Sequence, residues 1–276
     1  MLFRSNRRVF NMARKILHLD LDAFFCSVEE LLDPSLVGKA FAVGGNPQGR
    51  GVIASCSYAA RLKGVRSAMP AGKALQLCPE LIMIHHRHGL YSEYSERVMS
   101  ILQNTAPVVE QVSVDEAFVD VSDLPQPLIM IAFGLQKRVA DETQLPCSLG
   151  GAANKLVAKM ANDYGKAQVR TGRAPRAITI IEPGCEQAFM APLDIQALWG
   201  FGPKTADKLR DRGIYRIGQL YDLSEAELRS FFGNHASEIL DRAKGIDTRP
   251  VFDSEHDPKS VSNETTYYSD TDDLHQ

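Results

Sequence analysis

The sequence predicts an α+β fold, and two observations support this prediction. Short hydrophobic runs of strand-like composition alternate with segments of helical spacing around one apparent antiparallel hairpin. Residues 175–250, by contrast, carry mainly helical patterns. At 276 residues, with 44% hydrophobic and 24% charged side chains, the chain is long enough for two or three domains with cores. We therefore expect a ferredoxin-like α+β core, a small α/β part and a helical C-terminal part.

Acidic residues lie in two strand-like runs that are far apart in the chain. The first run, residues 16–25, contains Asp20. The second run, residues 108–121, is expected to form a hairpin whose tip carries Asp115 and Glu116. An ionised carboxylate at the end of a buried strand is costly unless it is paired or metal-bound. If the fold brings the three carboxylates together, they can hold two hard divalent cations.

The remaining elements follow from spacing and from the positions of glycine and proline. Residues 38–72 are rich in glycine and other small residues and contain two β-like runs. Strands are expected near residues 40–43, 51–54 and 146–150, and helices near residues 71–77, 91–104, 128–142 and 154–164.

Charge and cysteine content narrow the class of protein. The net charge is −3, but residues 251–276 hold seven acids against one lysine, which leaves the rest of the chain at +3. A mildly basic body permits contacts with phosphates. The five cysteines are widely spaced without a C-x-x-C pattern, so neither a disulfide framework nor a zinc site is indicated. No apolar run reaches the roughly 20 residues of a membrane helix, and we expect a cytoplasmic protein.

Three blocks in a fixed order resemble the Y-family DNA polymerases, in particular their DinB, or DNA polymerase IV, branch. The blocks are residues 20–30, 55–70 and 113–117, and the resemblance extends over roughly residues 12–266. It implies a palm, fingers, a helix-hairpin-helix thumb and the start of a C-terminal little-finger domain, of which we expect most to be missing from this fragment. The expected ranges are 1–11 for a disordered extension, 12–23 and 88–174 for the palm, 24–87 for the fingers, 175–250 for the thumb and 251–276 for the linker to the little finger.

The resemblance implies a two-metal site. Asp20 and Asp115 would bridge two Mg²⁺ ions, with Mn²⁺ as a substitute, and Glu116 would complete the site near the primer 3′ hydroxyl. The backbone carbonyl of Leu21 is a further candidate ligand. Asp22 shares a strand face with Asp20 if the strand continues that far, and we assign it a structural role.

Phe25 matches the family's steric gate, a ring that would clash with a 2′ hydroxyl and so selects deoxyribonucleotides. Adjacent residues of a strand point to opposite sides, so one of Phe24 and Phe25 is expected to fill the core. Phe24 is therefore a secondary candidate for contact with the nucleotide.

Four residues resemble the family's contacts with the triphosphate. Tyr58 and Arg61 are three residues apart, so they share one side of a helical turn, and Ser55 precedes them. Lys166, shortly after the helix expected at 154–164, matches the lysine that reaches the terminal phosphates. The family continues there with a Pro-Asn-Gly-like turn, from which this chain departs. Ordinary surface charge would explain any single one of these cations.

Residues 198–209 resemble a helix-hairpin-helix motif. Glycines allow a hairpin to approach a DNA backbone, and free amides at a helix start bind phosphate without reading sequence. The candidates for DNA contact are Gly200, Gly202, Lys204 and Thr205. A packing corner between two helices is the alternative explanation.

Together these features predict a template-directed translesion DNA polymerase of low processivity. Its partners would be primer–template DNA and an incoming dNTP, with a sliding clamp for the full-length protein, and we expect a monomer in the cytoplasm, at the nucleoid if the source is bacterial. The alternatives are a noncatalytic DNA-damage scaffold and a nucleotidyl cyclase, which also uses two metals on a ferredoxin-like core.

Overall fold

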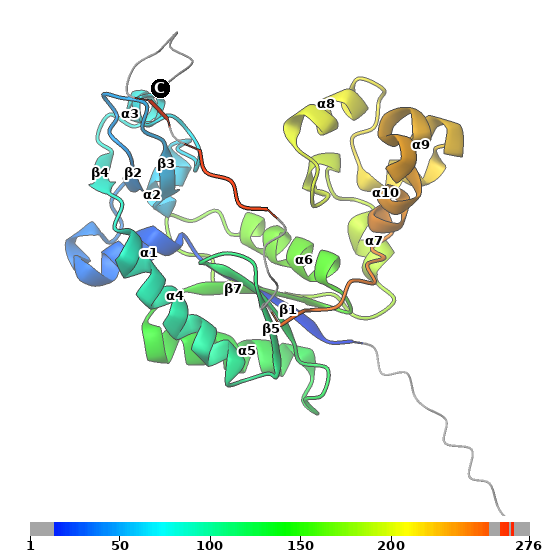
Figure 1. The fold of residues 1–276 in the computed structure, drawn as a ribbon, viewed down its shortest axis with the longest axis horizontal. Helices are drawn as coiled ribbons and strands as arrows, with labels where there is room; N and C mark the ends of the chain where they lie inside the picture. The colour runs from blue at the N-terminus through cyan, green and yellow to red at the C-terminus, as the bar shows by residue number, and fades with distance from the viewer. Residues whose placement is uncertain (1–13, 254–259, 265, 268–276) are drawn as a thin grey trace, which may run out of the picture.

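A computed structural model describes residues 14–253, 260–264 and 266–267 (Figure 1). The extension expected at residues 1–11 and most of the linker expected after residue 250 lie outside the described residues. The strands are β1 (Ile16–Leu21), β2 (Phe41–Gly44), β3 (Ile53–Cys56), β4 (Ile82–His85), β5 (Val108–Gln111), β6 (Glu116–Asp120), β7 (Cys147–Ala152) and β8 (Ile178–Ile180). The helices are α1 (Phe24–Leu32), α2 (Tyr58–Leu62), α3 (Ala71–Leu77), α4 (His88–Gln103), α5 (Leu128–Thr143), α6 (Lys155–Gln168), α7 (Glu186–Met190), α8 (Pro203–Arg210), α9 (Glu225–Phe232) and α10 (Ala236–Ala243), with short 3₁₀ turns at Pro34–Leu36, Ile195–Ala197, Ile217–Asp222 and Gly233–His235.

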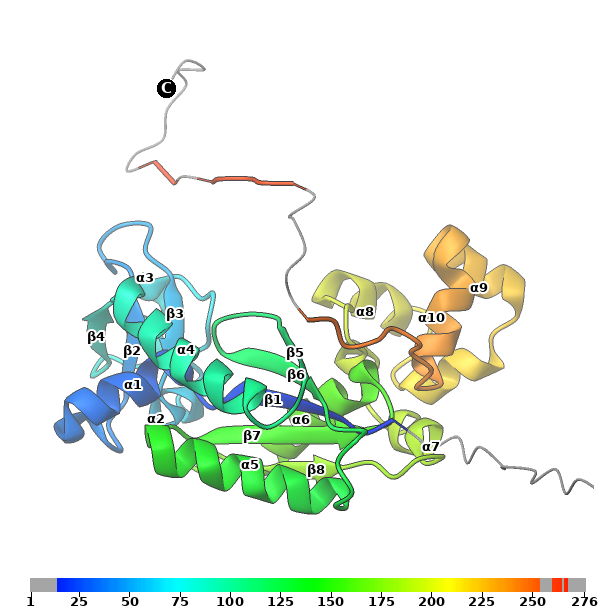
Figure 2. The ribbon, with the colours of Figure 1, turned by 60° about the horizontal axis from the view of Figure 1, so that its bottom comes forward.

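A five-stranded sheet in the order β5-β6-β1-β7-β8 forms the centre of the molecule. Strand β1 is antiparallel to β6 and β7, whereas β7 and β8 are parallel. The predicted hairpin is confirmed, because β5 and β6 pair antiparallel with Glu110 opposite Phe118. Helices α4 and α5 cover one face of the sheet and α6 covers the other (Figures 1 and 2).

The two faces of β1 differ in chemistry. All six residues are buried, and Leu17 and Leu19 pack into the core that α4 and α5 share. Burying such a side chain contributes about 1.5–3 kcal/mol. Because side chains alternate along a strand, His18 and Asp20 belong to the opposite face, which α6 covers. The polar residues therefore share the face that holds the candidate site.

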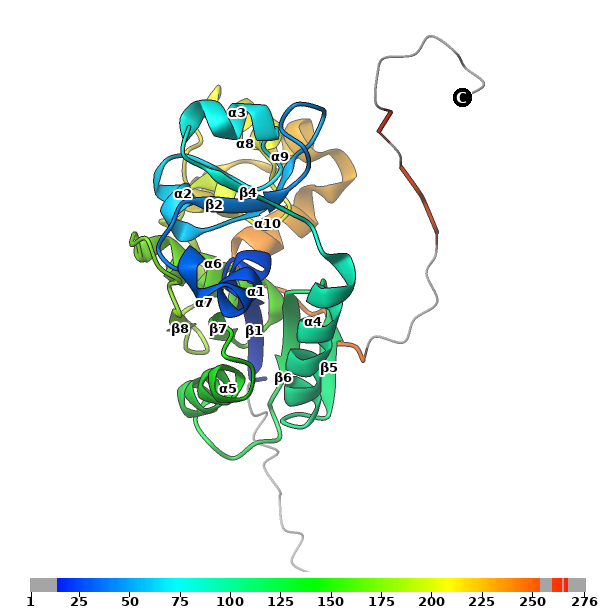
Figure 3. The same ribbon diagram turned by 90° about the vertical axis from the view of Figure 1, so that its left-hand side faces the viewer.

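Two smaller units stand at opposite ends of this sheet. One contains the three-stranded sheet β3-β2-β4 with α2 and α3, and the other contains α8, α9 and α10 (Figures 1 and 3). Each has buried apolar residues, such as Ile53 and Ala74 in the first and Leu209 and Ile217 in the second. All five cysteines are free. Within the described ranges, no helix has the length and apolar character needed to cross a bilayer.

Three local expectations were wrong. The strand-like run at residues 16–25 ends at Leu21, where Ala23 adopts a left-handed conformation (φ 46°) and turns the chain into α1. Phe24 and Phe25 therefore lie on the first turn of a helix and not on a strand. Helix α6 continues to Gln168 because no proline interrupts it, which places Lys166 within its last turn. Strand β8, a short Ile-Thr-Ile segment beside β7, lies in the stretch expected to be helical.

Candidate active site

The acidic residues of the two distant runs meet at one edge of the sheet. Asp20 on β1 is directly opposite Glu116, the first residue of β6. The backbone amide of Leu21 donates to the carbonyl of Asp115 at 2.9 Å, which holds the hairpin tip against the end of β1. Like charges directly opposite one another on a sheet repel. The arrangement therefore needs compensating positive charge.

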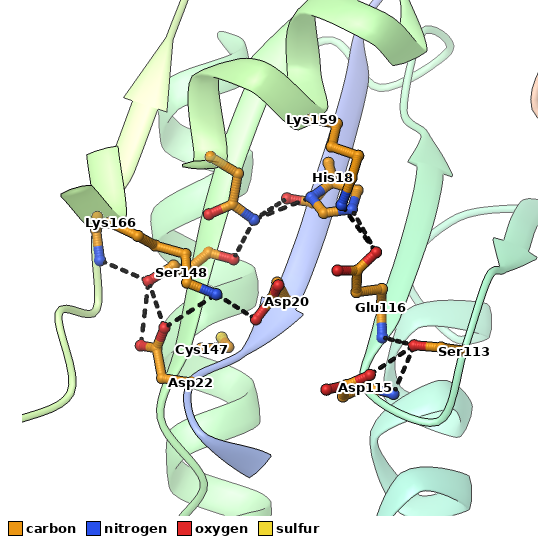
Figure 4. Close-up of polar contacts among 12 residues, drawn as sticks. His18, Asp20, Asp22, Ser113, Asp115, Glu116, Cys147, Ser148, Lys159 and Lys166 are labelled. Carbon is orange, nitrogen blue, oxygen red and sulfur yellow. Dashed lines mark hydrogen bonds and ion pairs between the residues drawn. The ribbon is translucent and has the colours of Figure 1, made fainter. Parts of the chain in front are cut away.

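Two lysines of α6 supply this positive charge, and a serine donates a hydrogen bond to the third carboxylate (Figure 4). The Nζ atom of Lys166 lies 2.5 Å from Asp20 Oδ1, and that of Lys159 lies 2.9 Å from Glu116 Oε2. The hydroxyl of Ser113 donates to Asp115 Oδ1 at 2.6 Å. Among the described residues, no three His, Cys, Asp or Glu side chains lie close enough together to hold one metal ion.

Burial and neighbours shift the two opposed carboxyl groups in opposite directions. Burial, together with Glu116 and Asp115, raises the pKa of Asp20 to about 7, although Lys166 acts against this shift. His18, whose Nε2 lies 3.6 Å from Glu116, and Lys159 hold the pKa of Glu116 well below its usual range despite its partial burial. Strongly perturbed carboxyl groups beside a cavity are typical of functional sites.

Asp22 has a different environment from Asp20. It is fully buried and accepts hydrogen bonds from Ser148 Oγ at 2.8 Å and from the backbone amide of Arg176 at 3.0 Å. Burial raises the pKa of Asp22, although Lys166 and Ser148 act against this. These contacts agree with a structural role.

A cavity of about 140 Å³ opens beside the carboxylates. It gathers residues from all three sequence blocks, so most of the predicted site residues do come together. Its lining consists of Asp20, Leu21, Ala23, Phe24, Phe25, Ala54, Ser55, Arg61, Ser67, Asp115 and Lys166. Tyr58 is not in this lining, but its ring stacks under Arg61, whose guanidinium carbon lies 4.6 Å from the ring centroid.

The aromatic side chain of Phe25 is held by other rings at the edge of this cavity. Tyr91 of α4 stacks on it with ring centroids 4.3 Å apart, and His86 approaches edge-on at 4.8 Å. The hydroxyl of Tyr91 donates to the buried Glu29 at 2.7 Å. Phe24 is 2% exposed and belongs to the sheet core, as expected for one of the two rings.

Several residues that hold the site were not singled out from the sequence. Lys159 precedes Lys166 by seven residues, and this helical spacing could have identified both as one face of α6. Asn162, on the same face, donates to the carbonyl of Ser148 at 3.1 Å. No spacing in the sequence identifies Tyr91 as part of the site, because its contact with Phe25 depends on how α4 packs on α1.

The predicted DNA-contact residues lie on the helical unit, apart from the carboxylates. Gly200 has a φ of +93°, which only glycine adopts readily, and Gly202 caps the start of α8. Lys204 and Thr205 lie in the first turn of that helix. No described side chain caps this start. Pro203 has no N–H, and the amide of Thr205 donates to the carbonyl of Gly202 at 3.1 Å, so the amide of Lys204 is the candidate donor to a phosphate.

The chain is similar to known proteins over almost its whole length. Residues 19–163 match the impB/mucB/samB family, and residues 183–214 match the IMS family HHH motif. DNA polymerase IV of Halorhodospira halophila is 40% identical over 264 residues, which cover 95% of this chain and 72% of that protein. DNA polymerase IV of Dehalococcoides mccartyi is 40% identical over 261 residues, or 94% of this chain and 65% of the relative.

Solved structures give the same picture. DinB from Sulfolobus solfataricus superposes with a TM-score of 0.79 at 29% identity, covering 87% of this chain and 69% of that one. An insertion ternary complex of Dbh DNA polymerase superposes with a TM-score of 0.77 at 30% identity, covering 86% and 69% of the two chains.

Proposed function

The chain belongs to the impB/mucB/samB family of Y-family DNA polymerases, and from this premise we propose that it is a template-directed translesion polymerase of low processivity. The observation that carries the proposal is the cavity in which Asp20 and Asp115 meet Phe25, Arg61 and Lys166. This one space combines acidic oxygens with phosphate-binding cations and a bulky ring, which is what nucleotide transfer requires.

Asp20, Asp115 and Glu116, with the backbone carbonyl of Leu21, would hold two divalent cations, Mg²⁺ by preference and Mn²⁺ as a substitute. The donor set fits, because its donors are all oxygens and Asp20, Leu21 and Asp115 line the cavity. Glu116 is not in that lining, but it is directly opposite Asp20 on the neighbouring strand. When bound, the ions would lower the pKa of the primer hydroxyl and stabilise charge on the leaving group. Lys166 forms an ion pair with Asp20 and Lys159 forms one with Glu116, so both carboxylates have positive charge beside them.

The nucleotide would lie with its phosphates toward Arg61 and Lys166, with Ser55 and Tyr58 as further contacts. Phe25 would contact the sugar and exclude a 2′ hydroxyl by steric overlap with its ring. Phe24, which is buried in the sheet core, would hold the start of α1 in place. In the reaction the primer 3′ hydroxyl loses its proton to solvent and its oxygen forms a bond to the α-phosphorus. The bond between the α-phosphorus and the oxygen that bridges to the β-phosphate breaks, and pyrophosphate leaves. The chain's own contribution is positioning and electrostatic compensation.

Primer–template DNA would contact the helical unit through the amides around Gly200 and Gly202 and the side chains of Lys204 and Thr205. We assign the palm to residues 12–23 and 88–174, the fingers to 24–87 and the thumb to 175–250. We further propose a monomer that works in the cytoplasm, at the nucleoid in a bacterium, and that reaches a sliding clamp through the little-finger domain of the full-length protein.

Primer extension on four templates that differ only in the first templating base tests the proposal. We expect addition of the matched dNTP on each template, in excess enzyme and with Mg²⁺. A nucleotidyl cyclase would instead form a cyclic product without template, and a scaffold would bind the primed DNA without adding a nucleotide. Either result would refute the polymerase function for this chain.

A further inference from the structure

The loop between α6 and β8, residues 169–177, carries three arginines. It is also the segment that departs from the family's Pro-Asn-Gly-like turn. Arg170 and Arg173 are exposed, and so is Arg176. Within the described part of the chain, none of their guanidinium groups forms an ion pair with an acidic side chain. Unpaired arginines on one loop are candidate binding groups for an anion.

Hydrogen bonds hold the C-terminal end of the loop in place. Arg176 donates its amide to Asp22, Ala177 donates its amide to Ser148 Oγ at 3.0 Å, and Gln136 donates to the carbonyl of Arg176 at 3.0 Å. Near the middle, a methyl group added to Gly172 would lie 3.6 Å from Leu62 of α2. The loop therefore packs between the sheet and α2. In addition, Arg176 has a φ of +47°, a conformation that is uncommon outside glycine.

A second cavity, of about 760 Å³, lies under this loop. Arg173 and Arg176 line it together with Tyr58 of α2 and Ser27 and Glu30 of α1. Its volume is in the range of small-molecule sites. Glu30 is the acid in its lining, and burial raises the pKa of that carboxyl group, which weakens its opposition to an anion.

The second cavity adjoins the candidate nucleotide site. Ala23 lines both cavities, and the stacked pair of Tyr58 and Arg61 contributes one residue to each. The hydroxyl of Tyr58 is buried and lies near the Asp22 carboxylate, so it is not open to the second cavity. Arg173 and Arg176 are therefore the groups of this lining that can bind an anion.

We propose that Arg173 and Arg176 form a second anion site that takes a condensed phosphate, namely the pyrophosphate that leaves the nucleotide site. The identity of the anion rests on the proposed polymerase function, whereas the existence of the site rests on the loop and the cavity. A second site next to the first would give the product a route away from the triphosphate position.

The affinity for pyrophosphate tests the site directly. It is measured by titrating sodium pyrophosphate into the 276-residue chain in the presence of saturating dATP and without DNA. We expect binding in the wild type and a loss of affinity of about tenfold or more in the double variant R173Q/R176Q, because two charge-assisted hydrogen bonds are removed. Arg170→Gln is the matched control, because Arg170 is exposed in the same loop but does not line the cavity, and it should leave the affinity unchanged.

Two results would overturn the proposal. Equal affinity in the wild type and the double variant would show that the arginines bind no pyrophosphate. Pyrophosphate binding that depends on the arginines without dATP, but disappears at saturating dATP, would show that the arginines serve the incoming triphosphate and no separate site. The titration needs no turnover, so it tests the anion site independently of the polymerase function. If only the polymerase function were wrong, the wild type would still bind pyrophosphate through these arginines but would not extend a primer.

Discussion

The ring of Tyr91 stacks on the ring of Phe25 with an interplanar angle of 21°. Tyr91 is itself fixed, since its hydroxyl donates to Glu29, one helical turn after Phe25 on α1. Glu29 also accepts from Arg87 at 2.7 Å. A steric gate can exclude a 2′ hydroxyl only if its ring cannot move aside, and this packing provides that rigidity.

Replacing Phe25 with alanine should admit ribonucleotides. We expect the discrimination between dNTP and rNTP, as the ratio of kcat/KM values, to fall by about 10- to 200-fold, since a clash confined to one pocket is relieved. Tyr91→Ala should lower the ratio by a smaller factor, because Phe25 remains but loses its support. Tyr91→Phe keeps the stacked ring but loses the hydrogen bond to Glu29, so it should lower the ratio less than Tyr91→Ala does. An unchanged ratio in Phe25→Ala would remove the gate assignment.

Gly200 and Gly202 should respond differently to alanine. Gly200 has a positive φ, and a Cβ there would lie 3.0 Å from Nη2 of Arg242, whereas Gly202 has a φ of −84° and open space. We expect Gly200→Ala to lower the free energy of unfolding by about 1–2 kcal/mol, and Gly202→Ala to leave it almost unchanged. Urea unfolding followed by fluorescence of Trp199, the single tryptophan, measures both. Equal stabilities would contradict the backbone argument.

Asp247 should stabilise the fold in a pH-dependent way. Its carboxylate accepts from the amide of Leu156 in the first turn of α6 and from Arg249. Burial raises the pKa of Asp247, but the hydrogen bonds from Arg249 outweigh it and hold the pKa below the usual value. A depressed pKa means that the stabilising contribution is complete above the unfolded-state pKa of about 3.9 and is lost as the pH falls below it.

Asp247→Asn should therefore lower the free energy of unfolding by about 1.5–3 kcal/mol at pH 7, and the difference from the wild type should shrink below pH 4. Urea unfolding at pH 7 and at pH 3.5 measures this. Asp241→Asn, an exposed acid on α10, is the control and should have little effect at either pH. A difference that persists unchanged at pH 3.5 would argue against a charged Asp247.

The local pattern of apolar and acidic residues predicted much of this structure. The features that it did not predict depend on packing between segments far apart in the sequence. Alternating apolar residues predicted the hairpin and the start of β1, although that strand ends at Leu21 and not at residue 25. The acidic pair within the hairpin run singled out Asp115 and Glu116 as candidate ligands. The left-handed Ala23 was not predictable, because alanine is not a residue that favours such a turn. The pairing of Lys166 with Asp20 joins residues 146 positions apart, and it follows from the packing of α6 on the sheet.

We propose that the carboxylates at the edge of the sheet, Asp20, Asp115 and Glu116, are required for nucleotide addition. Asp115→Asn tests it most directly, because Asp115 contacts Ser113 and no lysine, and asparagine can keep that hydrogen bond. Under single-turnover conditions with Mg²⁺ and primed template, we expect the rate of matched dNTP addition to fall by at least about 10³-fold. Asp123→Asn, an exposed acid beyond β6, should keep the wild-type rate. A wild-type rate in Asp115→Asn would contradict the assignment of this site.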